Sequence, residues 1–315
     1  MKKLLILSSV LSLVLLSGCT KTVQNSATVF ALDTVVNIKG NTNTATINSA
    51  VDLVRQYESA LSRTKEDSEI ALLNKNGAAI ISDETLSLIK LSLEYSEKTD
   101  GKFDITIAPV SSLWDFNSDN LPQSDDIKAA LPQVDYKKIT LDGNYVSLGG
   151  TTVDLGAVAK GYITQKVYEY LKAQNVPSAT INLGGNVAVL GEEVQNIGIK
   201  DPNGSGIAAT LKLKNALVST AGVYERYIEK DGKRYHHILD TKTGYGVQTD
   251  VLSASVICDD GAKGDILATA CVLLSSQKAL DLINSTDGAE AIIITADGKI
   301  HISSGIYCEN GYYLL

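Results

Sequence analysis

Two adjacent histidines are the first candidates for chemistry. His236 and His237 stand in the segment YHHILDTKTG, and the chain contains only three histidines in all. Histidine changes its protonation most readily near neutral pH, so it often serves as a general base. Neighbouring residues on a strand point to opposite faces, so only one of the two can face a given site. Spacing alone does not decide which, and either could be a structural strand residue.

A second candidate is a pair of oxygen ligands in the segment GDILATA. Asp265 and Thr269 are four residues apart, and side chains at that spacing share one face of a helix. One carboxylate and one hydroxyl suit Mg²⁺, which keeps several waters and shares its ligand shell with substrate phosphates. Asp265 could instead be an acidic residue that stabilises a helix N-terminus.

Two glycine-containing segments are the remaining candidates. In VDLGAVAKG, small residues open a helix, where backbone N–H groups and Lys160 could approach a phosphate. The segment has neither GxGxxG nor GxxxxGK[ST] spacing, so it indicates no Rossmann or P-loop fold, and a tightly packed helix start is the alternative. In TDGKFDITIAP, Asp104 could bind a ligand or simply cap the turn, and the run that ends at Pro109 is strand-like.

Helices and strands must position these residues. Apolar residues recur at helical spacing from Ile47 to Leu61, behind Ser82 and from Ala159 to Leu171, and the segment 264–283 has the stripe of one helix. ATINLGGNVAVLG predicts a strand, a tight turn and a strand, and Asp-Gly pairs at 231–232 and 297–298 predict two hairpins. The pattern indicates an α+β fold with mixed sheets and packed helices.

Composition limits the class of protein. Hydrophobic residues make up 44% of the 315-residue chain and charged residues 20%, which predicts a folded protein with a sizeable core. The net charge of -8 gives no electropositive surface for a phosphate backbone. We therefore expect no nucleic-acid partner.

The N-terminus predicts the location of the protein. Two lysines precede an apolar run that is too short to span a bilayer, and the run ends in LSGC, which resembles a lipobox. Residues 1–18 would be a lipoprotein signal peptide, Cys19 the lipidated residue and residues 19–28 a tether. Residues 29–315 would form the main domain, anchored by lipid to the cell membrane on its extracytoplasmic side.

All these segments, in this order, resemble the ApbE family of FAD:protein FMN transferases. The resemblance runs from FALDTVVNI through DSEIALLNKNG, TDGKFDITIAPVSSLWDF, VDLGAVAKGYI, INLGGNVAVLG, VSTAGVYERY, YHHILDTKTG and GDILATA. It implies an ApbE-like fold that binds FAD in a cleft between two subdomains. It also implies magnesium-dependent transfer of FMN from FAD to a threonine hydroxyl of an extracytoplasmic acceptor flavoprotein, with release of AMP.

The resemblance also implies roles for individual residues. It makes His237 the base that deprotonates the threonine, with His236 facing away. It makes Asp265, Thr269 and the carbonyl of Ala157 ligands of Mg²⁺. It assigns FAD contacts to Leu32, Thr64, Lys102, Phe103, Asp104, Asp154, Lys160 and Ile238.

Two positions depart from the family pattern, and two other functions stay open. Leu32 and Asp33 precede Thr34 where the family often has methionine and glycine, and Thr64 stands where an aromatic residue is common. A magnesium-dependent FAD pyrophosphatase would differ only in using water as the acceptor. A non-catalytic FAD-binding lipoprotein would need neither a base nor a metal. The expected partners are FAD, an acceptor protein with a threonine flavinylation motif, and the membrane through Cys19.

Overall fold

A computed structural model describes residues 23–315 of the chain. The predicted signal peptide and Cys19 lie outside the described residues. The first strand already begins at Gln24, which is earlier than the domain start predicted at residue 29. Within residues 23–315, no helix has both the length and the apolar character needed to cross a membrane.

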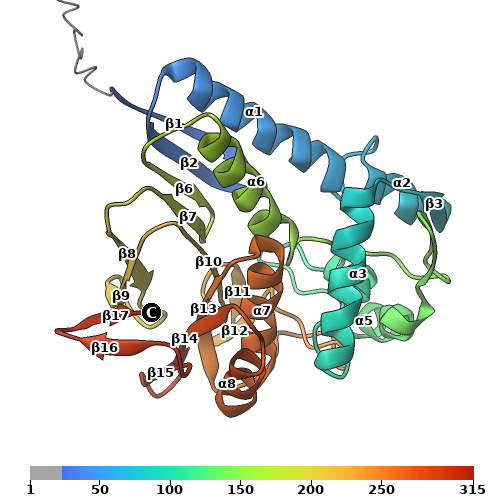
Figure 1. Cartoon of the computed structure of the whole chain (residues 1–315). Helices are drawn as coiled ribbons and strands as arrows, with labels where there is room; N and C mark the ends of the chain where they lie inside the picture. The colour runs from blue at the N-terminus through green and yellow to red at the C-terminus, as the bar shows by residue number, and fades with distance from the viewer. Residues whose placement is uncertain (1–22) are drawn as a thin grey trace, which may run out of the picture.

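An eight-stranded antiparallel sheet forms the centre of the fold (Figure 1). Each strand pairs antiparallel with its neighbour, and sequence neighbours pair through tight turns at several points. In spatial order the strands are β1 (Gln24–Ala31), β2 (Thr34–Asn41), β6 (Ala179–Leu183), β7 (Asn186–Leu190), β10 (Ala216–Gly222), β13 (Val251–Cys258), β14 (Ala289–Thr295) and β15 (Ile300–Ile302).

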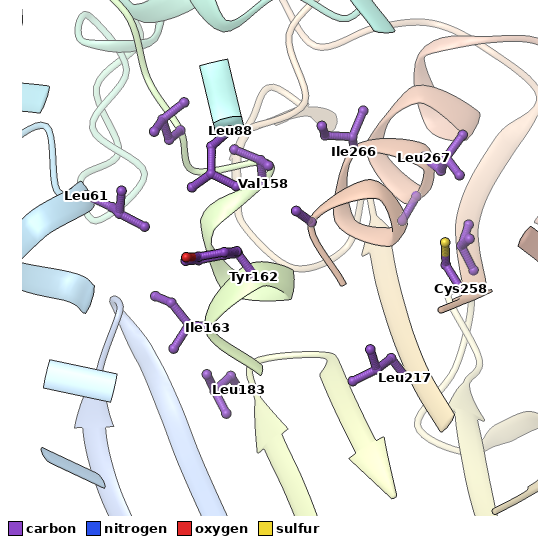
Figure 2. Close-up of a cluster of buried hydrophobic side chains, with 14 of the residues drawn as sticks. Leu61, Leu88, Val158, Tyr162, Ile163, Leu183, Leu217, Cys258, Ile266 and Leu267 are labelled. Atoms are coloured by element: carbon purple, nitrogen blue, oxygen red, sulfur yellow. The ribbon is translucent and has the colours of Figure 1, made fainter. Parts of the chain in front are cut away.

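Three helices pack against this sheet and against one another. They are α1 (Thr44–Leu61), α6 (Ala159–Ala173) and α7 (Gly261–Leu273). Their apolar side chains share one core with the strands, in which Ile163 of α6, Leu183 of β6 and Ile266 of α7 are fully buried or nearly so (Figure 2). Burial of such side chains is the main favourable term in folding, so this core fixes where α6 and α7 begin.

Two smaller layers complete the described fold. One joins a three-stranded sheet to helices and contains α2 (Glu69–Asn76), β3 (Ala78–Ile80), α3 (Asp83–Lys98), α4 (Ala108–Ser111), α5 (Ser124–Ala130), β4 (Thr140–Asp142) and β5 (Tyr145–Ser147), with 3₁₀ turns at Ile105–Ile107, Leu131–Gln133 and Tyr136–Lys138. The other is a four-stranded sheet of β8 (Gln195–Lys200), β9 (Ile207–Leu213), β16 (Tyr307–Glu309) and β17 (Tyr312–Leu314).

The predicted helices and hairpins are confirmed in their main features. Ser82 caps α3 by accepting a hydrogen bond from the backbone of Thr85, as expected for a helix start. The Asp231–Gly232 turn joins β11 (Tyr227–Lys230) to β12 (Lys233–His236), and both turn residues have positive φ. The hairpin of β14 and β15 turns at Asp297–Gly298.

Two predicted elements are wrong. The segment 264–283 is not one helix, because α7 ends at Leu273 and α8 (Ser276–Asn284) begins behind Ser275. The run that ends at Pro109 is not a strand, because residues from Ile105 onward form a 3₁₀ turn and then the short helix α4. Asp104 caps that turn and Pro109 stands in the first turn of α4, where proline is tolerated, so local hydrogen bonding overrides the strand-like pattern.

Candidate active site

His237 lies directly after β12 and is held by a backbone carbonyl. Its ring nitrogen Nδ1 lies 3.3 Å from the carbonyl oxygen of Arg226, and its backbone nitrogen donates to the same oxygen at 3.1 Å. A carbonyl oxygen can only accept, so Nδ1 carries the proton of the neutral ring. The other ring nitrogen, Nε2, is therefore left without a proton and can act as a base.

The two histidines have different surroundings. His236 is buried with 6% exposure, and its Nε2 bonds to the carbonyl of Val247 at 3.0 Å. His237 is half-buried, and its ring stands nearly perpendicular to the Phe116 ring, with 6.3 Å between the ring centroids. The predicted strand alternation ends at His236, because the next two apolar residues, Ile238 and Leu239, are both buried. Of the two adjacent histidines, only His236 is therefore buried.

Charged groups surround His237. Burial, followed by the positive charge of Lys160, lowers the pKa of His237 to about 4, and Arg226 adds to the effect. Glu225 keeps access to solvent, but the surrounding protein removes part of its water and raises its pKa to about 7, with Lys160 opposing and Asp265 reinforcing the shift. Lys160, Glu225, Asp265 and His237 therefore lie near enough for their charges to interact.

Asp265, near the start of α7, is buried and joined to two other elements. One carboxylate oxygen accepts from the backbone nitrogen of Gly161 in α6 at 2.9 Å, and the other accepts from the Asn186 amide at 3.2 Å. The oxygen of the same Asn186 amide is buried and has no hydrogen-bond partner among the described residues. A buried acceptor without a donor costs free energy, so a cation or a donating ligand beside Asp265 would supply the partner that the Asn186 oxygen lacks.

The residues present fit a magnesium ion. Each carboxylate oxygen of Asp265 has a lone pair left after one hydrogen bond, and Thr269 lies one helical turn further along α7, half-buried. Ala157 stands half-buried in the turn before α6. Within residues 23–315, no group of three histidine, cysteine or acidic side chains could hold a metal. A cation here would rely on Asp265, neutral oxygens, water and substrate phosphate, which is typical of Mg²⁺.

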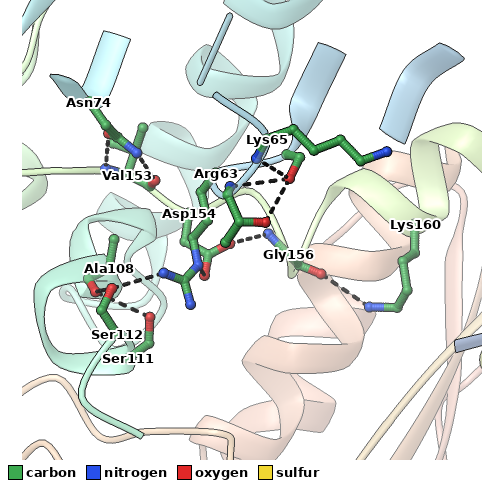
Figure 3. A network of polar contacts seen from close by, with 12 residues as sticks. Arg63, Lys65, Asn74, Ala108, Ser111, Ser112, Val153, Asp154, Gly156 and Lys160 are labelled. Carbon is green, nitrogen blue, oxygen red and sulfur yellow. Dashed lines mark hydrogen bonds and ion pairs between the residues drawn. The ribbon is translucent and has the colours of Figure 1, made fainter. Parts of the chain in front are cut away.

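Asp154 connects Lys160 to a second set of polar residues (Figure 3). Its carboxylate forms an ion pair with Arg63 at 2.9 Å and accepts from the backbone nitrogen of Gly156 at 2.8 Å. The ammonium of Lys160 donates to the Gly156 carbonyl at 3.1 Å, and Arg63 also donates to Ser112. Asp154 and Lys160 therefore hold opposite sides of one turn at the start of α6.

The turn at Lys102 contributes buried side chains. Asp104 is fully engaged, because its carboxylate accepts two bonds from Thr106 and one from the backbone of Tyr136. Phe103 is 3% exposed and belongs to the main core, whereas Lys102 is half-buried. Of the two sequence interpretations of Asp104, the structure supports the capping role. The turn still lies beside the histidine segment, since Thr241 donates to the Gly101 carbonyl at 2.8 Å.

The remaining predicted FAD contacts are spread over three elements. Leu32 stands in the β1–β2 turn at a φ of 55°, and its backbone nitrogen donates to Glu58 at 2.8 Å. Thr64 is exposed in the loop after α1, with its hydroxyl bonded to Ser62. Ile238 is 6% exposed and packs in the main core. A cavity of about 440 Å³ lies apart from His237, between α1, α2, α3 and Tyr162.

Sequence reasoning missed four residues of this site. Arg63, Asn186, Glu225 and Arg226 contact the predicted residues or act on their charges. Asn186, Glu225 and Arg226 stand inside segments that resemble the ApbE pattern, whereas Arg63 lies just before one of them. No spacing rule points to any of these four residues individually. Their partners are distant in the chain, since Asn186 and Asp265 are 79 residues apart and Arg226 and Asp33 are 193 apart.

Comparison with known proteins defines the class. The model of the ApbE family matches residues 32–293, so the chain belongs to the ApbE family. A Treponema pallidum protein named FAD:protein FMN transferase is 34% identical over 291 residues, which cover 83% of this chain and 80% of that protein. A Klebsiella pneumoniae protein of the same name is 35% identical over 263 residues, which cover 80% and 83%.

Solved structures agree with the fold. The crystal structure of an ApbE protein from Thermotoga maritima has a TM-score of 0.80 and 31% identity, and the match covers 90% of this chain and 97% of that chain. The flavin transferase ApbE from Vibrio cholerae has a TM-score of 0.78, with 89% and 97% covered, and at 23% identity it supports the fold alone. The predicted α+β class and ApbE-like fold are thereby confirmed.

Proposed function

We propose that this chain is an enzyme that transfers FMN from FAD to a threonine hydroxyl of an acceptor protein and releases AMP. Membership of the ApbE family and the name shared by its relatives support FMN transfer from FAD to a protein. The observation that carries the proposal within this chain is the fixed ring of His237, whose Nε2 is free to accept a proton beside Lys160. A non-catalytic FAD-binding protein would need no such base.

The reaction would be a phosphoryl-type substitution. Nε2 of His237 takes the proton of the threonine hydroxyl, and the hydroxyl oxygen forms a bond to the phosphorus on the FMN side of FAD. The bond from that phosphorus to the bridging oxygen breaks, and AMP leaves with the bridging oxygen and its electron pair. Lys160 supplies positive charge close to His237, where the leaving phosphate gains negative charge. The phosphate charges of bound FAD would in turn raise the low pKa of His237.

Asp265, Thr269 and the carbonyl of Ala157 would hold Mg²⁺ in this reaction. The ion supplies Lewis-acid stabilisation of charge on the phosphate oxygens when it is bound. The hydrogen bonds from Gly161 and Asn186 fix the orientation of the Asp265 carboxylate, so this ligand is preorganised. This arrangement supports a magnesium site built on one carboxylate.

The proposed FAD contacts lie mainly in turns, at the start of α6, at Lys102 and between β1 and β2. Asp154 and Lys160 would contact the nucleotide at the start of α6, where backbone nitrogens favour phosphate. Leu32, Thr64, Lys102 and Ile238 would contact it from the surrounding turns, in a cleft between two subdomains. Phe103 and Asp104 are buried, so they would shape this wall through the turn that they hold.

We further propose that the protein is anchored to the membrane through a lipid on Cys19, with its domain on the extracytoplasmic side. The lipobox-like LSGC segment supports this location, and the acceptor would then be another extracytoplasmic protein that carries a threonine flavinylation motif. A Cys19→Ser variant is expected to move from the membrane pellet to the supernatant after cell fractionation. Retention of the variant in the pellet would contradict the anchor.

One assay separates the candidate functions. The protein is incubated with FAD, Mg²⁺ and a candidate acceptor, the acceptor is weighed by intact-protein mass spectrometry, and AMP is measured in the same sample. We expect a mass gain equal to FMN on the acceptor, equal amounts of AMP, and loss of both with EDTA. AMP and free FMN without a mass gain would indicate an FAD pyrophosphatase, and FAD binding without AMP would indicate a non-catalytic binder.

A further inference from the structure

Arg226 connects the candidate base to a distant turn. It lies between β10 and β11, and its backbone carbonyl receives both hydrogen bonds from His237, at 3.1 and 3.3 Å. Its guanidinium donates from Nη2 to the carbonyl of Asp33 at 2.9 Å. One residue thus contacts His237 through its backbone and the β1–β2 turn through its side chain.

The β1–β2 turn is a firm attachment point. Leu32 and Asp33 both have positive φ, at 55° and 54°, as in the tight hairpin turns that suit the twist of paired strands. The turn is fixed from two further sides, because Glu58 accepts from the Leu32 nitrogen and Thr34 packs against the backbone of Gly184. A side chain bonded to this turn is therefore attached to the central sheet.

The loop that carries Arg226 has fewer constraints of its own. Glu225 and Arg226, which stand between β10 and β11, are exposed, and the backbone nitrogen of Glu225 makes a long bond of 3.4 Å to Gly222. The Arg226 carbonyl is placed from one side by the β11–β12 pairing, which its bond from the His237 nitrogen extends. The side-chain bond to Asp33 attaches it from the other side to the β1–β2 turn. Outer partners that fix a functional histidine in this way also decide which nitrogen stays free.

We propose that Arg226 is a positioning residue for His237. Its side chain attaches it to the β1–β2 turn, and its backbone carbonyl orients the imidazole ring of His237. This inference deepens the proposed function and rests on it for the role of His237 as base. The positive charge of Arg226 acts in the same direction, because it disfavours the imidazolium form together with Lys160 from α6 and His236 from β12. Neutral His237 with a free Nε2 is the form that a base requires.

The test reads the tautomer of His237 directly in the ligand-free protein. The chain has only three histidines, so imidazole ¹⁵N signals can be assigned by single substitutions. In the wild type we expect His237 to carry its proton on Nδ1. In Arg226→Ala we expect a mixture of tautomers, a higher His237 pKa, and kcat lowered about 10- to 100-fold with little change in the KM for FAD.

Two further variants separate positioning from general damage. Arg226→Lys keeps a cationic donor and is expected to restore much of the tautomer preference and kcat. Arg234→Ala removes another exposed arginine, which pairs with Glu229 and lies over the Tyr227 ring without contacting His237 or the β1–β2 turn, and is expected to behave as wild type. If Arg226→Ala disturbs folding, Arg226→Met provides the same reading, because it keeps an unbranched side chain but has no donor for the Asp33 carbonyl.

Wild-type tautomer, pKa and kcat in Arg226→Ala would overturn the inference. A fall in kcat with an unchanged His237 signal would overturn it as well, because the effect would then not pass through the base. The imidazole signals need neither FAD nor acceptor. The wild type could show no transfer while Arg226→Ala still changed the tautomer of His237 from Nδ1–H to a mixture. The proposed function would then fail, and the positioning role of Arg226 would stand.

Discussion

The carboxylate of Asp265 in α7 accepts a hydrogen bond from the backbone nitrogen of Gly161 in α6 at 2.9 Å. The two helices approach so closely here that a Cβ on Gly161 would lie 2.0 Å from the carbonyl oxygen of Gly261. The proposed magnesium ligand is thus placed by a helix contact that only glycine permits.

Gly161→Ala should disturb both stability and the metal site. The added methyl group meets backbone atoms that cannot rotate away, so we expect a loss of about 1–3 kcal/mol in the free energy of unfolding. Urea unfolding measures this loss, and a magnesium titration of transfer should show a higher magnesium requirement. Gly206→Ala is the matched control, because a Cβ at Gly206 meets nothing within 4 Å. Equal stability of the two variants would contradict the tight contact.

The adjacent histidines should separate into one functional and one structural residue. His237→Ala is expected to keep FAD binding but lose transfer by about 10²- to 10⁴-fold, the usual contribution of a general base. His236→Ala should instead lower the free energy of unfolding by about 1–3 kcal/mol, since it removes a buried ring and its bond to the Val247 carbonyl, which would keep only the bond from Gln248. Transfer rates and urea unfolding of both variants test this, and wild-type transfer by His237→Ala would refute its role.

Asp265→Asn should reduce magnesium binding without removing the side chain. The amide keeps the size of the carboxylate but lacks the charge that attracts the ion, so we expect a higher magnesium requirement and lower transfer together. Binding of Mg²⁺ by calorimetry in the presence of FAD gives a reading that does not depend on turnover. Asp281→Asn, an exposed residue of α8, makes the same change in charge away from the site. Equal titration curves for the two variants would rule out the ligand role.

His237 should also make stability depend on pH. Its native pKa is about 4 and its ordinary value 6.5, so between these values the unfolded chain binds more protons than the native state. The contribution of His237 to stability is full above pH 6.5 and falls as the pH drops toward 4. Urea unfolding at pH 7.5 and pH 5 should show a smaller difference for His237→Gln than for the wild type. An equal difference would contradict the lowered pKa.

Asp104→Asn should behave as a structural change. Both carboxylate oxygens accept hydrogen bonds, from Thr106 and from the backbone nitrogen of Tyr136. In the asparagine variant the NH₂ group would replace one of these oxygens and would face a donor, so at least one hydrogen bond would be lost. We expect a loss of about 1–3 kcal/mol in the free energy of unfolding. A normal free energy of unfolding together with a greatly raised KM for FAD would instead favour direct ligand contact.

The sequence by itself determined most helices, the main hairpins and the two segments that meet at the site. Local hydrogen bonding and apolar periodicity are properties of neighbouring residues, so Ser82 and the Asp231–Gly232 turn could be recognised directly. The resemblance of whole segments to one family then selected His237 over His236, which spacing alone did not do.

Only the tertiary structure decided how these residues are held. The break between α7 and α8 depends on how each helix packs, because the apolar stripe continues across it. The unpartnered oxygen of Asn186 beside Asp265, and the bond from Arg226 to Asp33 across 193 residues, are invisible in any local pattern. Chain segments meet through burial of a shared core, and the polar contacts of the site form only once that core has placed α6, α7 and the central strands together.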